Sequence, residues 1–173
     1  MSFASRVTLV VLGLLLSACS TQSSQTDVKL SRTGSWVLLP LVNLAQAPQA
    51  AEGAEQILFS VLAANGLTVT PAPQQQQPAD EFPLEDSQRL QQALQWARQR
   101  GDTYAITGSV EEWQYKSGLD GEPAVGITLR VIEPASGRIL WSASAARAGW
   151  SRESLAGAAQ TVLEGLVDDL PLE

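Results

Sequence analysis

The 173-residue chain contains no histidine, one cysteine and only two lysines. Zinc, iron and copper sites are built from clustered histidine and cysteine ligands, and a serine nucleophile usually needs a histidine base. The chain also lacks the glycine-rich motifs that bind nucleotide phosphates. Hydrophobic residues nevertheless make up 45% of the sequence, so a disordered protein is not expected. These absences predict a folded protein that is not an enzyme and needs no metal or other cofactor.

The N-terminal segment MSFASRVTLVVLGLLLSACS carries one early arginine and then an apolar run over residues 7–16. The run is too short to cross a bilayer and is typical of a secretory signal peptide. It ends in LSAC, residues 16–19, which matches a bacterial lipobox. We therefore predict a signal peptide over residues 1–18 and a covalent lipid on Cys19; the alternative is an ordinary signal peptide with a chance cysteine. By resemblance to sorted lipoproteins, Ser20 favours the periplasmic face of the outer membrane.

The charge balance restricts the partners of the mature chain. Removal of the signal peptide leaves 10 basic and 18 acidic residues, a formal charge of −8. Nucleic acid and bare anionic lipid are poor partners for such a surface, whereas a cationic partner is favoured. Membrane attachment is instead expected through the lipid on Cys19, because two or three acyl chains make a stable anchor.

The mature chain divides into a tether and one domain. Residues 19–33 combine the lipidated cysteine with the polar stretch STQSSQTDVKLSRT, which predicts a flexible tether. Fourteen flexible residues have a root-mean-square span of about 20 Å, so the domain at 34–173 is expected to stay close to the membrane. Within the domain, residues 72–86 are rich in proline and acid, with four glutamines at 74–77, and are expected to form a solvated loop.

Hydrophobic periodicity divides the domain into five strands and three helices. The predicted strands cover residues 35–43, 67–71, 103–115, 124–134 and 137–145, and the predicted helices cover 48–66, 87–101 and about 151–170. In the fourth strand, Ile127, Leu129 and Val131 alternate with Thr128 and Arg130, as expected when one face is buried. The order β-α-β-α-β-β-β-α predicts a single α/β domain, with a mixed sheet of about five strands and helices packed on it.

Four carboxylates, Glu111, Glu112, Asp120 and Glu122, are the candidates for acid–base work or binding. Glu111 and Glu112 are adjacent on a predicted strand, so their side chains are expected on opposite faces and cannot flank one bond. Asp120 and Glu122 lie in the turn KSGLDGEP, where exposure gives no reason for raised pKa values. The turn pair is either a plain surface hairpin, with Asp-Gly chosen for turn geometry, or a binding element.

The stretch AGWSRESL, residues 148–155, places a tryptophan just before a predicted helix. Ser151 is the expected N-cap, and Glu153 would lie in the first turn, where the helix dipole favours negative charge. With that cap, Trp150 and Leu155 have the spacing of a hydrophobic staple. The amphipathic indole also suits a membrane interface. We predict that Trp150 contacts the membrane, with the staple as the alternative.

Two segments resemble known families. GSWVLLPLVNL, residues 34–44, is similar to the opening strand of periplasmic domains related to the N-terminal domain of TolB and to CsgG. The longer stretch at 101–157, from GDTYAITGSV to GWSRESLAG, resembles the PelC family of outer-membrane lipoproteins of Pel exopolysaccharide secretion. The hairpin GLDGEPAVG and the segment GWSRESLAG carry most of the specificity of this resemblance.

The resemblance to the PelC family implies a homo-oligomeric closed ring, such as a dodecamer, at the periplasmic face of the outer membrane beside the export porin PelB. It also implies a cationic, partly deacetylated amino-sugar polymer, which the ring guides to the porin during biofilm matrix secretion. Asp120 and Glu122, with Glu111 and Glu112, are then expected on the polymer path. Cyclic symmetry repeats each carboxylate around the axis, and rings of carboxylates favour cations.

Other envelope roles fit a TolB-like domain with a lipid anchor. Lipoproteins that activate peptidoglycan synthases usually have a long disordered linker, and the tether predicted here is short. A curli-type channel subunit needs additional membrane-inserting hairpins with strands of about ten residues. The long strands predicted here already belong to the domain sheet. Binding or scaffolding of another cell-envelope assembly is the alternative function.

Overall fold

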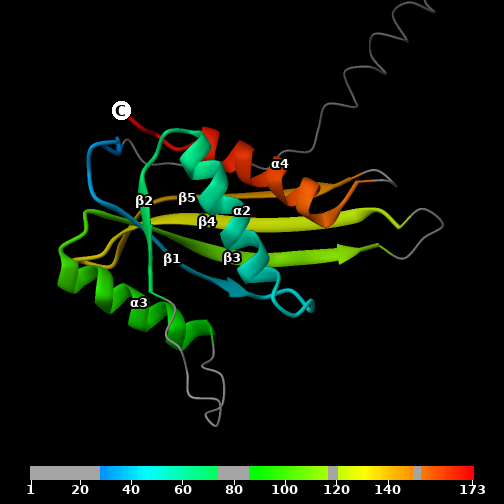
Figure 1. Ribbon diagram of the computed structural model, residues 1–173, viewed down its shortest axis with the longest axis horizontal. Helices are drawn as coiled ribbons and strands as arrows, with labels where there is room; N and C mark the ends of the chain where they lie inside the picture. The colour runs from blue at the N-terminus through cyan, green and yellow to red at the C-terminus, as the bar shows by residue number, and fades with distance from the viewer. Residues whose placement is uncertain (1–27, 74–85, 117–120, 150–152) are drawn as a thin grey trace, which may run out of the picture.

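The computed structural model describes residues 28–73, 86–116, 121–149 and 153–173. They form a five-stranded mixed sheet with the strand order β2-β1-β3-β4-β5 (Figure 1). The strands are β1 (Trp36–Asn43), β2 (Val69–Pro71), β3 (Tyr104–Tyr115), β4 (Pro123–Glu133) and β5 (Arg138–Ala148). β1 runs parallel to β2 and β3, whereas β3, β4 and β5 form an antiparallel meander.

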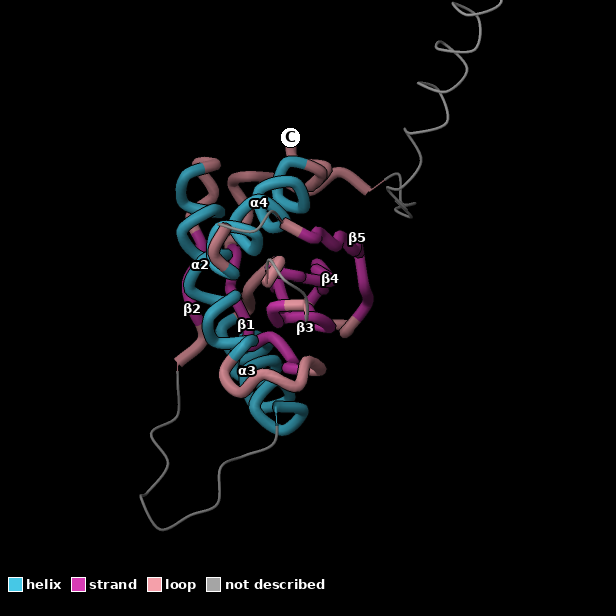
Figure 2. Tube along the Cα trace, turned by 90° about the vertical axis from the view of Figure 1, so that its right-hand side faces the viewer, coloured by secondary structure: helices cyan, strands magenta, loops and turns pink. Residues whose placement is uncertain are grey.

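In the described ranges, three helices cover parts of both faces of the sheet: α2 (Ala50–Ala64), α3 (Asp86–Arg100) and α4 (Leu155–Asp168). α2 and α4 lie side by side on one face, and α3 packs on the other face beneath β1 (Figure 2). The larger core lies between the sheet and α2 with α4, and the smaller core joins α3 to β1. The predicted single α/β domain and its order of elements are therefore confirmed.

The alternation predicted for the fourth strand appears in β4. Ile127, Leu129 and Val131 are buried in the larger core. On the opposite face, the hydroxyls of Thr128 and Ser144 are 2.8 Å apart, which joins β4 to β5. The sequence pattern therefore identified correctly which face of the meander the helices cover.

Two element boundaries differ from the sequence-based expectation by three residues or more. The last helix begins at Leu155 rather than near residue 151, because Ser154 is the N-cap and its hydroxyl accepts a hydrogen bond from the Gly157 N–H at 3.0 Å. β5 continues to Ala148, beyond the predicted end at residue 145, because its last residues still pair with the beginning of β4.

The folded part of the chain begins before residue 34. Leu30 is fully buried and forms a parallel bridge with Leu172. The Leu30 N–H donates to the Pro171 carbonyl at 2.9 Å, and the Glu173 N–H donates to the Leu30 carbonyl at 3.0 Å. The prediction of a flexible tether over 19–33 is therefore wrong for residues 28–33, because an apolar side chain in this polar stretch completes the core beside the C-terminus.

Candidate functional site

The two segments that stand out in the sequence, the acidic turn before β4 and the stretch before α4, meet at one end of the sheet. The Lys116 N–H donates to the Glu122 carbonyl at 2.7 Å and closes the β3–β4 hairpin. The Gly149 N–H donates to the Pro123 carbonyl at 2.8 Å, so the chain leaving β5 lies beside that hairpin. We call this region the hairpin end. Figure 1 shows that it extends beyond α2 and α4.

The β3–β4 hairpin, from the middle of the sheet to the hairpin end, carries the predicted site residues that the structure describes. These residues are Glu111, Glu112 and Glu122. Glu111 and Glu122 are exposed, and Glu112 is half-buried. The other predicted site residues, Cys19, Asp120 and Trp150, lie outside the described residues, so their roles stay predictions.

A β-bulge in β3 sets the direction of the two adjacent glutamates. Val110 and Glu112 pair with consecutive residues of β4, so Glu111 is an extra residue in the strand. Val110 points into the larger core, whereas the Glu111 carboxylate accepts from the Ser109 hydroxyl at 2.5 Å on the opposite face. The Cβ of Glu112 lies over Gly126 on that same face. The expectation that the two glutamates point to opposite faces is therefore wrong, because the bulge interrupts the alternation.

An ion pair joins Arg147, near the end of β5, to Glu153, which precedes α4. Arg147 Nη2 lies 3.2 Å from Glu153 Oε2 and 3.4 Å from Glu153 Oε1. Gly149 lies beside this pair, where a Cβ would overlap the Glu153 carboxylate and come within 2.8 Å of Pro123 Cγ. Sequence reasoning assigned Glu153 to the helix dipole and missed the pair. The opposite charges that flank the Gly-Trp dipeptide are the signal that could have indicated it.

The position of the N-cap of α4 determines whether Trp150 has the spacing of a hydrophobic staple. Ser154 caps the helix, and the hydroxyl of Tyr115 on β3 accepts from the Leu155 N–H at 3.3 Å. With this cap, Trp150 lies four residues before the N-cap instead of one, so Trp150 and Leu155 do not have the staple spacing. The sequence argument for a staple is therefore wrong, and membrane contact by Trp150 stays a prediction.

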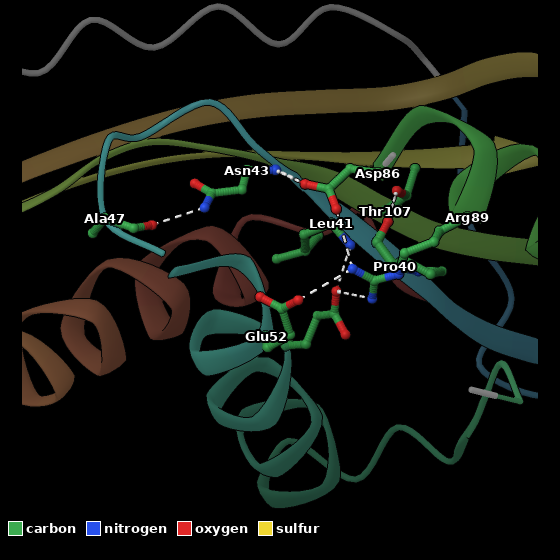
Figure 3. A network of polar contacts seen from close by, with 9 residues as sticks. Pro40, Leu41, Asn43, Ala47, Glu52, Asp86, Arg89 and Thr107 are labelled. Atoms are coloured by element: carbon green, nitrogen blue, oxygen red, sulfur yellow. Dashed lines mark hydrogen bonds and ion pairs between the residues drawn. The ribbon is translucent and has the colours of Figure 1, made fainter. Parts of the chain in front are cut away.

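A second polar cluster lies where β1 continues beyond the last residue of its short neighbour β2 (Figure 3). The pairing of β1 with β3 shifts register around Pro40, and the next backbone amides face the side that β2 no longer covers. Beyond the end of β2, side-chain carboxylates accept hydrogen bonds from the backbone N–H groups of β1 in place of a neighbouring strand. Glu55 on α2 accepts from the Leu41 N–H at 2.8 Å, and Asp86 on α3 accepts from the Asn43 N–H at 2.8 Å.

Arg89 joins the carboxylates of this cluster. Its Nη1 lies 3.1 Å from Asp86 Oδ1 and 3.2 Å from Glu52 Oε1, and its Nη2 lies 4.0 Å from Glu55 Oε1. Burial raises the pKa of Glu55, while the Leu41 N–H and the charge of Arg89 act to lower it. The carboxylates accept hydrogen bonds from the backbone of β1 and pair with the charge of Arg89. The cluster therefore holds α2 and α3 to the sheet. Sequence reasoning missed it because its members come from three separate segments.

Two further features bear on chemistry and on the membrane. Within the described ranges, no group of three or more cysteine, aspartate or glutamate residues could hold a metal ion. In the same part of the chain, no helix combines the length and the apolar character that crossing a membrane requires.

Comparison with known proteins gives first the fold class and then the family. No protein-family model matches the chain, and no curated protein matches it significantly. Lipoprotein GNA1162 from Neisseria meningitidis has the same α/β fold, with a TM-score of 0.58 and 19% identity over 78% of this chain and 96% of that chain.

A PelC dodecamer from Paraburkholderia phytofirmans is more similar, with 32% identity, a TM-score of 0.71 and coverage of 88% of this chain and 98% of that chain. A point variant of the same dodecamer gives a TM-score of 0.72 and covers 99% of that chain. The chain belongs to the PelC family, and the resemblance noted in its sequence is confirmed.

Proposed function

We propose that this protein is a non-enzymatic, lipid-anchored subunit of a closed ring at the periplasmic face of the outer membrane. The ring guides a cationic exopolysaccharide to the export porin PelB during biofilm matrix secretion. Family membership supports the ring, because the relatives from P. phytofirmans are dodecamers. The observation that carries the guiding role is the position of three acidic side chains on one β-hairpin: Glu111 and Glu112 lie on one face of β3, and Glu122 lies beside the turn between β3 and β4.

The charge at the hairpin end suits transport better than tight binding. In a ring, each carboxylate is repeated around the axis, and a concave wall of one charge sign concentrates counter-charged ligands. Each exposed contact is weak, so a cationic polymer can move from one copy to the next, as conduction through ion channels also requires. Asp120 belongs to the same hairpin in the sequence, and we propose the same role for it.

If Cys19 carries the lipid anchor and Trp150 contacts the membrane, both residues must reach the same membrane surface. Leu30 packs beside the C-terminus, at the end of the domain away from the hairpin end (Figure 1). Between these ends lies α4, with 14 residues and a length of about 20 Å. Residues 20–27 reach at most about 28 Å when extended. A tether that runs back along the domain would therefore cover a distance as long as α4, in the direction of the hairpin end.

The guiding role is tested by removing charge at the hairpin end in cells. Three double variants replace the chromosomal copy: Asp120→Asn with Glu122→Gln, Glu111→Gln with Glu112→Gln, and the control Asp168→Asn with Glu173→Gln. The control removes as many charges from the exposed region near the C-terminus. We expect both hairpin-end variants to secrete less cationic polymer at normal protein level, and the control to secrete normally. Normal secretion by a strain that combines all four hairpin-end substitutions would contradict the guiding role.

A further inference from the structure

The exposed surface of α3 is rich in glutamine. Five of the 15 residues of this helix are glutamines, and all five are exposed. Their helical spacing places them on one side of α3, opposite the buried alanines that pack on β1. We call this surface the glutamine stripe, and its members are Gln88, Gln91, Gln92, Gln95 and Gln99.

The glutamine stripe carries no charge, although the chain has 18 acidic residues. Asp86 is the acidic residue of α3, and its carboxylate accepts from the backbone of β1. The exposed charges that border the stripe are positive, on Arg98 and Arg100. This surface therefore does not attract a cationic ligand and suits an uncharged polar one.

The side-chain amides of the stripe are available for binding. Each amide can donate two hydrogen bonds and also accept through its oxygen. Among the described residues, no partner hydrogen-bonds to any of these five side chains. Elsewhere in the domain, the amides of Gln114 and Gln160 instead donate to carboxylates on their own elements. The stripe thus presents the donors and acceptors that the hydroxyl and N-acetyl groups of a sugar require.

An indole lies at the edge of the stripe. Trp96 is half-buried, and helical spacing places it beside Gln92 and Gln99. The Arg100 guanidinium lies 4.7 Å from the centroid of the Trp96 ring, and Arg100 Nε lies 3.0 Å from the buried Asp102 carboxylate. The indole N–H has no acceptor among the described residues. An oriented aromatic ring next to free amides matches a sugar, whose ring has apolar C–H faces and a polar rim.

α3 also lies beside the acidic residues of β3. It packs on the face of the sheet to which both glutamates of the bulge point (Figure 2). Asp86 at the start of α3 accepts from the Asn43 N–H, and Asn43 pairs with Val110 at the bulge. The glutamine stripe therefore begins near the bulge and continues along α3 for about 16 Å. One polymer chain can contact the acidic residues and the stripe together.

We propose that the glutamine stripe and Trp96 bind the uncharged, N-acetylated residues of the polymer, an inference that rests on the proposed function. A partly deacetylated amino-sugar polymer contains residues of two kinds, cationic and N-acetylated. The carboxylates of the β3–β4 hairpin attract the first kind. The amides of α3 hydrogen-bond to the second kind, and the exposed part of the indole packs on the sugar ring. Each neutral contact is weak because it replaces hydrogen bonds to water, so the polymer can still move.

The test titrates the full-length protein in mild detergent with two probes. One probe is the hexamer of N-acetylglucosamine, which is uncharged, and the other is the fully deacetylated hexamer, which is cationic. The wild type should bind both hexamers. Only the cationic hexamer should lose affinity as salt rises, because salt screens interactions between charges.

The triple variant Gln92→Ala, Gln95→Ala and Gln99→Ala removes the amides from the stripe. Alanine favours helix, so the fold should be kept. The acetylated hexamer should bind about tenfold more weakly or worse, because several hydrogen bonds are lost, while binding of the cationic hexamer should not change. Gln46→Ala, at an exposed position outside α3, is the control and should bind both hexamers as the wild type does.

Trp96→Phe keeps an apolar ring on the smaller core and removes the indole N–H. The acetylated hexamer should change the tryptophan fluorescence of the wild type, and a change that persists in Trp96→Phe would contradict contact with this residue. Equal binding of the acetylated hexamer by the triple variant and the wild type would overturn the stripe as a site. A wild type that binds only the cationic hexamer would also overturn it, while the proposed function would stand. A wild type that binds neither hexamer would overturn both.

Discussion

Replacing Glu55 by alanine should destabilise the domain by leaving the Leu41 N–H without an acceptor. The Glu55 side chain is 12% exposed, and its Oε1 accepts from that N–H at 2.8 Å, on the side of β1 that β2 does not reach. A buried donor left unsatisfied costs about 1–3 kcal/mol. For a domain of this size, such a loss lowers the melting temperature by about 3–10 °C.

The conservative variant Glu55→Gln separates the hydrogen bond from the charge. Its amide oxygen can still accept from Leu41, and losing the distant contact with Arg89 should cost less than about 1 kcal/mol. Burial raises the pKa of Glu55 above its ordinary value of 4.5, so the folded state holds the proton more tightly than the unfolded state does. Wild-type stability should therefore fall as the pH rises from 4.5 through the raised pKa, and the glutamine variant should lack this decline.

Thermal unfolding of the full-length proteins, followed by circular dichroism from acidic to neutral pH, measures both effects. The expected order of melting temperature at neutral pH is alanine variant lowest, with the glutamine variant near wild type. An alanine variant that melts together with wild type would refute the reasoning, because Leu41 would then not depend on Glu55. A glutamine variant with the full wild-type pH dependence would show that the decline has another origin.

The remaining predictions concern the N-terminus of α4, the hairpin end and the membrane. Ser154→Ala should lower the free energy of unfolding by about 0.5–2 kcal/mol through loss of the N-cap, and Ser151→Ala should not; equal losses in chemical denaturation would contradict the helix start. Gly149→Ala should cost about 1–3 kcal/mol, because its methyl group would lie 2.8 Å from Pro123 Cγ and would push the Glu153 carboxylate away from Arg147; an unchanged melting temperature would mean that the segment moves aside freely. Cys19→Ala should move the protein out of the membrane fraction and abolish labelling by a fatty acid, and retention at wild-type levels would contradict lipidation. In that background, Trp150→Ala should weaken association with phospholipid vesicles at unchanged melting temperature, whereas lower stability with unchanged association would assign the tryptophan to packing.

Local patterning predicts most of the fold. The alternation of Ile127, Leu129 and Val131 places one face of β4 in the core, and the apolar faces of the three helices do the same for the helix layers. The order of elements is then enough for a mixed sheet, since long antiparallel strands joined by tight turns must pair as neighbours. These inferences succeed because each depends on residues that are close in the sequence.

The parts that could not be predicted depend on irregular backbone or on distant contacts. Alternation assigns Glu111 and Glu112 to opposite faces, and the bulge that unites them has no distinct signal in the sequence. Ser151 and Ser154 are equally good caps locally, and the contact of Leu155 with Tyr115 on another strand accompanies the second. The burial of Leu30 likewise requires the C-terminal residues, which are distant in the sequence.

The central claim is that the hairpin end of a ring attracts a cationic polymer. The most direct measurement is a calorimetric titration of the full-length protein with a soluble, partly deacetylated amino-sugar polymer. The titration is repeated at increasing salt concentrations. The wild type should bind at low salt and weaken as salt rises, because screening removes exposed charge interactions. A variant with Glu111, Glu112, Asp120 and Glu122 neutralised, still assembled as a ring, should bind at least about tenfold more weakly, a difference of about 1.4 kcal/mol. Equal binding by the two rings, or no binding by the wild type, would contradict the account.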